Sequence, residues 1–87
     1  SAYMSDLLSC VMTGAKPRSV WVTLIANINI VAVASLLEIS AIIITEDAQP
    51  NQDTIDRANM EGIVLLSTKD SSYNVAGHLW DLGIKDH

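Results

Sequence analysis

Residues 20–45 (VWVTLIANINIVAVASLLEISAIIIT) form a long apolar stretch that contains a single charged side chain. Two short runs rich in β-branched residues, at residues 20–24 and 41–45, flank a longer apolar segment at residues 28–37. Continuous apolar runs are typical of strands that are covered on both faces of a parallel sheet. The middle segment is too long for a typical strand, so we interpret it as a helix. The stretch therefore predicts a strand–helix–strand unit with a right-handed crossover.

The rest of the chain continues the alternation of helices and strands. We predict a short helix that ends at Gly14, a helix over residues 53–61 that stops at Gly62, a strand over residues 63–66, and a last helix that ends near Gly83. Strands that alternate with helices predict a parallel sheet between helix layers. We therefore expect a small three-layer α/β fold with three strands and helices on both faces.

Three strands are few for such a sheet, so we expect that a strand is missing before Ser1. A chain of 87 residues is long enough for one small domain. The prediction is a single domain over residues 1–87, truncated at its N-terminus.

Charge and composition exclude several classes of partner. The net charge of −5 repels phosphate backbones, which argues against nucleic-acid binding. The apolar stretch is long enough to cross a bilayer. However, Asn27, Asn29 and Glu38 interrupt it, and only Lys16 and Arg18 lie before it as positive flanking residues. A second strand–helix pattern follows at once, so we predict no membrane segment.

The chain has one cysteine, Cys10, which cannot form an internal disulfide. No signal peptide is visible, because the first apolar run is short and contains Asp6. A reducing cytoplasm is the compartment that this cysteine content favours.

Polar residues follow each predicted strand, where open α/β sheets bind ligands. They are Thr23, Asn27 and Asn29 after the first strand, Thr45, Glu46 and Asp47 after the second, and Ser67, Thr68 and Lys69 after the third. Two hydroxyls and an ammonium before a capped helix could hold a phosphate or another small anion. The alternative is that these residues only cap helices and solvate loops, since Ser, Thr and Asn are common caps.

Catalytic and metal-binding patterns are missing from the sequence. It has neither a Walker A motif nor a GxGxxG motif, and no nucleophile is paired with a base. His78 and His87 are far apart and lack a cluster of carboxylates or cysteines around them. We therefore predict no enzyme activity, no metal site and no cofactor.

Several segments together resemble the DRTGG domain family. They are SDLLS at residues 5–9, NIVAVAS at residues 29–35, the Pro50, Thr54 and Ile55 pattern, and G-I-x-x-L-S-T at residues 62–68. The resemblance covers nearly the whole chain. It implies a regulatory or dimerising module with no catalytic activity, of the kind that accompanies CBS domains or stands alone as a relative of the HPr kinase N-terminal region. The Asp-Arg-Thr-Gly-Gly motif itself is not readable at Ser1 to Tyr3.

The composition also predicts a homodimer. Hydrophobic residues make up 49% of the chain, which is more than a lone small domain can easily bury. The predicted helix at residues 28–37 has no polar face, so the sheet can cover only one of its sides. Our leading hypothesis is a non-catalytic regulatory and dimerisation module. The alternative is a sensor that binds a nucleotide or another anion at the strand ends.

Overall fold

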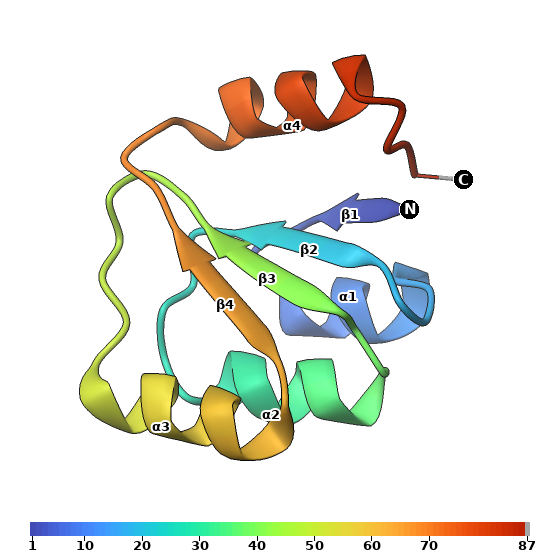
Figure 1. Cartoon of the computed structure of the whole chain (residues 1–87). Helices are drawn as coiled ribbons and strands as arrows, with labels where there is room; N and C mark the ends of the chain where they lie inside the picture. The colour runs from blue at the N-terminus through green and yellow to red at the C-terminus, as the bar shows by residue number, and fades with distance from the viewer. Residues whose placement is uncertain (87) are drawn as a thin grey trace.

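The computed structural model describes residues 1–86, in which strands and helices alternate from the first element to the last (Figure 1). The elements are β1 (Ala2–Met4), α1 (Leu8–Gly14), β2 (Val20–Thr23), α2 (Asn29–Leu36), β3 (Ala41–Ile44), α3 (Gln52–Glu61), β4 (Val64–Ser67) and α4 (Ser72–Asp81). The predicted α/β class is confirmed.

All the strands run parallel in one sheet, in the order β1-β2-β3-β4. The sheet has four strands, so the prediction of three was wrong. Residues Ala2–Met4 themselves form a strand beside β2, where we had expected a strand to be missing before Ser1. These three residues include no β-branched side chain, and they are too few to show the alternation of a strand. Only their pairing with β2 identifies them as a strand.

The two faces of the sheet are covered unequally (Figure 1). Each strand is followed along the chain by its neighbour in the sheet, and right-handed crossovers then place α1, α2 and α3 on one common face. α4 follows the last strand and lies on the opposite face, where it packs against β1 and β2. Helices on both faces are therefore confirmed, but α4 alone serves the second face.

The hydrophobic core lies between the sheet and the three-helix layer. Its centre consists of Trp21, Ile42 and Ile44 from the sheet and Ile30 and Val31 from α2, all fully buried. Each such side chain contributes about 1.5–3 kcal/mol by leaving water. The indole of Trp21 is also satisfied, because its Nε1–H donates to the backbone oxygen of Ser5 at 3.0 Å.

Three helices end in the same backbone arrangement. A residue with left-handed φ follows α2, α3 and α4, namely Glu38, Gly62 and Gly83. In each case the next residue is an isoleucine whose N–H donates to the carbonyl five residues earlier, at 2.9 Å. This is the Schellman motif, which satisfies carbonyls that the helix end leaves unpaired. Gly62 and Gly83 were predicted to end their helices, and both predictions are confirmed.

α2 is apolar nearly all round, as predicted, and it lies between α1 and α3 in the helix layer. Ile30, Val31 and Ala34 face the core, whereas Leu36 is 69% exposed. The far side of this helix is therefore a surface of the chain. Within residues 1–86, no helix has both the length and the apolar composition needed to cross a bilayer.

Candidate functional site

The carboxyl end of β2 is closed by hydrogen bonds. The hydroxyl of Thr23, which is fully buried, donates to Oδ1 of Asp6 at 2.9 Å and accepts the N–H of Ile25 at 3.1 Å. The same carboxylate oxygen accepts the N–H of Leu24 at 2.8 Å. Thr23 was predicted to bind a ligand, but its hydroxyl joins the β1–α1 loop to the end of β2.

A second set of bonds closes the end of β3. The hydroxyl of Thr45, also buried, contacts the carbonyl of Thr23 and the hydroxyl of Ser72. The carboxylate of Glu46 accepts the N–H of Ser72 at 2.8 Å, at the first residue of α4. These bonds fix the start of α4 to the end of β3 and leave Thr45 no spare hydrogen for a ligand.

A tight turn follows β3 at residues 45–48, closed by the bond from Ala48 N–H to the Thr45 carbonyl at 3.1 Å. Both central residues, Glu46 and Asp47, have φ near +60°, which is typical of a type I′ turn. Such turns favour glycine and asparagine, so the two acidic residues hold a conformation that costs them energy. The β4–α4 loop holds this turn in place. The backbone carbonyl of Asp70 accepts the N–H of Glu46, and that of Thr68 accepts the N–H of Asp47.

Ser67, Thr68 and Lys69 line a small hollow of about 190 Å³ together with Asp47 and Gln49. These three residues were predicted to lie together at the end of a strand, and the hollow is consistent with that prediction. Asn27 and Asn29 do not line it: both are exposed at the start of α2, where Oδ1 of Asn27 accepts the N–H of Asn29 at 3.0 Å. The carboxylate of Asp47 in the same hollow opposes the binding of an anion.

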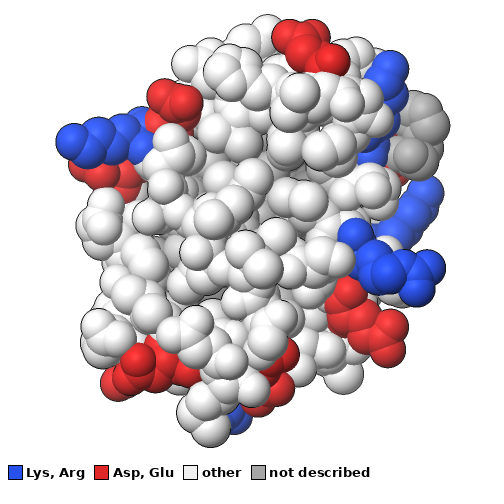
Figure 2. Space-filling view, in the orientation of Figure 1, with Lys and Arg blue, Asp and Glu red and all other residues white. Residues whose placement is uncertain are grey.

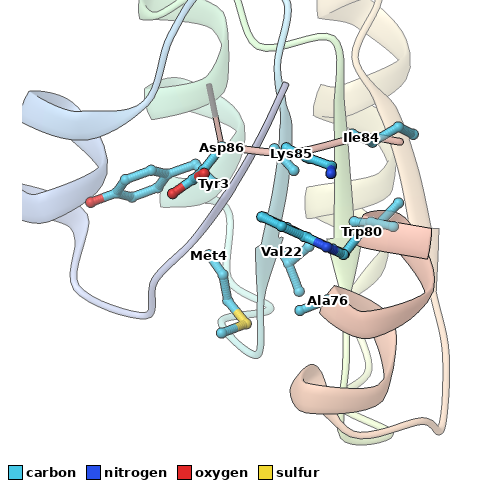
Figure 3. Close-up of a pocket in the computed structure, with 10 residues that line it drawn as sticks. Tyr3, Met4, Val22, Ala76, Trp80, Ile84, Lys85 and Asp86 are labelled. Atoms are coloured by element: carbon cyan, nitrogen blue, oxygen red, sulfur yellow. The ribbon is translucent and has the colours of Figure 1, made fainter. Parts of the chain in front are cut away.

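A second pocket, of about 290 Å³, lies where β1 meets α4 and the C-terminal segment (Figure 3). Met4, Val22, Ala76 and Ile84 contribute apolar walls, and Nζ of Lys85 lies 4.3 Å from the centroid of the Trp80 ring. Sequence reasoning missed this pocket, because its residues come from opposite ends of the chain. The two ends are joined beside the pocket, where the Ala2 N–H donates to the Lys85 carbonyl at 2.7 Å.

A third hollow, of about 490 Å³, is a groove between α3 and β4. Its lining includes Ile55 and Ala58 from α3 and every residue of β4. Figure 2 shows that the face seen in the orientation of Figure 1, with β4 in front, has its charged side chains around the outline and an uncharged middle. The groove therefore opens on an uncharged surface.

Two apolar side chains of β4 also stand uncovered on the α4 side of the sheet. Val64 is 53% exposed and Leu66 is 51% exposed. They share this face with Ala41 and Ile43, their register partners in β3. We call Ala41, Ile43, Val64 and Leu66 the open patch. It exists because α4 packs over β1 and β2 and does not reach this half of the sheet.

The comparisons add no relative. No family model matches the chain, and neither the curated proteins nor the solved structures provide a significant match. Among residues 1–86, no group of three or more His, Cys, Asp and Glu side chains is placed to hold a metal ion.

Proposed function

We propose that this chain is a non-catalytic regulatory module of the DRTGG type that acts through formation of a homodimer. The observation that carries the proposal is the open patch beside an uncharged edge strand. The helix Ile28–Leu37 that first suggested a dimer supports it less, because Val33 and the neighbouring Leu8 pack against the core.

An exposed apolar surface on a parallel sheet is unusual and favours burial by another element or chain. Strands of parallel sheets are normally buried on both faces. Here Val22, which lies under α4, is buried, while the side chains of Val64 and Leu66 remain about half in water. Completing their burial yields roughly 1 kcal/mol for each side chain, and a two-fold interface counts each contribution twice.

Sedimentation velocity of the whole chain tests the proposal. At micromolar concentration we expect a species of twice the chain mass of 9.4 kDa. A single species at 9.4 kDa across the micromolar range would disprove the dimer. Because sedimentation reports the size of the species and not the residues in contact, this result needs no knowledge of the interface.

The second candidate is a sensor for a nucleotide or another small anion. The observation that favours it is the hollow at the end of β4, where Ser67, Thr68 and Lys69 lie together. Lys69 supplies its cation, but Asp47 shares the hollow and Glu46 and Asp70 are close in the chain. Any anion bound there would depend on Lys69 for most of its attraction.

Calorimetric titration with ADP and with inorganic phosphate tests the sensor. Replacement of Lys69 by alanine should weaken binding by about 1–3 kcal/mol, the contribution of a charge-assisted hydrogen bond. Lys16→Ala removes an exposed lysine outside the hollow and should leave affinity unchanged. No heat at millimolar ligand would remove this candidate and leave the dimer proposal standing.

A further inference from the structure

We infer that two copies of the chain join edge to edge through β4, antiparallel about a two-fold axis at Leu65, so that their sheets form one continuous sheet. This inference rests on the proposed dimer and names its surface. The free hydrogen-bonding groups of β4, its composition, the charges at its ends and the groove beside it support this pairing.

The outer edge of β4 carries unpaired backbone groups. The N–H groups of Val64 and Thr68 donate to β3 or to Ser40 just before it, at 3.4 and 2.9 Å. Successive backbone groups of a strand point to opposite sides, so those of Leu65 and Ser67 point away from β3. The structure places no strand there, because β4 is last in the sheet order.

This edge lacks the features that normally prevent association. Natural edge strands carry charged residues, proline or bulges that deter pairing with another chain. β4 has the sequence VLLS, without any of these. The opposite edge differs: at β1, the N–H of Ala2 is already bonded to the carbonyl of Lys85. The sheet is therefore protected on one side and open on the other.

The charges that flank β4 favour a second copy as the occupant and set its direction. Glu61 precedes the strand and Lys69 follows it, four residues on either side of Leu65. Antiparallel pairing about Leu65 brings Lys69 of each copy toward Glu61 of the other, while Asp70 next to Lys69 and Asp47 in the same hollow weaken that attraction. Arg57 lies 3.6 Å from the Glu61 carboxylate and reduces this attraction, so the charges mainly orient the strands.

The groove accommodates the side chains of an added strand. Leu65 points to the α3 side of the sheet, because it shares its register with the core residues Trp21 and Ile42. A strand paired with β4 would place its own leucine above the groove of about 490 Å³, next to Ile55 and Ala58. Both the backbone and the side chains of a second copy thus find partners.

Cysteine crosslinking of the full chain tests the inference. Cys10 is exposed and is first replaced by serine. In that background, Leu65→Cys should be joined to its counterpart by a short bis-maleimide, because residues on the axis of an antiparallel pair lie about 5.5 Å apart between Cα atoms. Leu36→Cys is the matched control: it is 69% exposed but lies on α2, away from β4, and should remain uncrosslinked.

Sedimentation of the same samples separates the outcomes. A dimer that crosslinks at Leu65 and not at Leu36 supports the inference. A dimer in which Leu65 reacts no more than Leu36 overturns the β4 pairing and leaves the proposed function intact. A wild-type monomer overturns both.

Amide hydrogen exchange of the unmodified chain decides the matter if Leu65→Cys does not fold. We expect the N–H groups of Leu65 and Ser67 to be protected at concentrations where the chain is a dimer and to lose that protection on dilution to the monomer. Exchange of these two amides that is fast in the dimer as well would overturn the pairing.

Discussion

Single residues decide how well the helix ends of this chain are stabilised, and Glu38 is the weakest of them. It holds φ near +59° after α2, at the position where α3 and α4 use Gly62 and Gly83. Glu38→Gly should raise the free energy of unfolding by about 0.5–1 kcal/mol, because glycine adopts this conformation without strain. Urea unfolding measures the change.

Glu38→Ala is the control for this prediction. It removes the same exposed carboxylate but keeps a Cβ atom in the left-handed conformation. We expect no gain from it. Equal stabilisation by alanine and glycine would show that charge, and not backbone strain, limits this position.

Asp6 is a second residue on which local structure depends. Its Oδ1 accepts hydrogen bonds from the hydroxyl of Thr23 and the N–H of Leu24. Asp6→Ala should lower the free energy of unfolding by about 1–3 kcal/mol, because it leaves the buried hydroxyl without its acceptor. Asp6→Asn keeps an oxygen at that position and should cost less. Chemical denaturation of both variants checks the order, and an alanine variant as stable as the asparagine variant would contradict it.

These residue-level contacts also show why the candidate site was only partly predictable. Parallel strands end at one edge, so the sequence correctly indicated that Ser67, Thr68 and Lys69 lie at the same edge as Thr23. It did not indicate that the hydroxyl of Thr23 donates its hydrogen bond to Asp6, a residue 17 positions earlier in the chain. A polar residue at a strand end can bind a ligand or fasten a loop, and only its neighbours in space distinguish the two roles.

Among the elements, α3 offers a direct test of a side-chain cap. Oδ1 of Asn51 accepts the N–H of Thr54 at 3.0 Å and its hydroxyl at 2.8 Å. Asn51→Ala should lower the free energy of unfolding by about 1 kcal/mol, whereas Asn51→Asp should retain most of the stability. Thermal unfolding followed by circular dichroism compares the two. An alanine variant that unfolds at the wild-type temperature would exclude a stabilising role for the cap.

The elements were predictable where a pattern extended over several residues. The apolar runs that became β2 and β3, and the glycines after α3 and α4, were identified within one or two residues. β1 was missed because three residues are too few to show an alternation. The end of α2 was predicted at residue 37 and lies at Leu36, although the glutamate at position 38 gives no stop signal of the kind that glycine gives.

The arrangement of the elements in the whole molecule was the property hardest to predict from the sequence. The order of helices and strands predicts layers, but it does not say over which strands the last helix lies. In α4, Val75 is buried, and Ala76 and Leu79 line the pocket beside β1. It packs against β1 as well as β2, and β1 comes from the other end of the chain. The open patch is a consequence of that position and could not be predicted.

At this scale, the proposed dimer makes folding depend on protein concentration. Unfolding of a dimer releases two chains, so mass action raises the melting temperature as concentration increases. With about 0.7 kcal/mol of unfolding enthalpy per residue, we expect a rise of about 4 °C for each tenfold increase in concentration. Differential scanning calorimetry measures it directly.

A pair of matched substitutions connects this dependence to a surface. Leu66→Lys places a charge in the open patch and, through the two-fold axis, a second like charge near it, so the melting temperature should no longer depend on concentration. Leu36→Lys introduces the same charge at an exposed leucine of α2 and should preserve the dependence. Because both leucines are at least half exposed in the single chain, neither change removes core packing. If Leu36→Lys abolished the dependence and Leu66→Lys retained it, the interface would lie on the helix layer and not at β4.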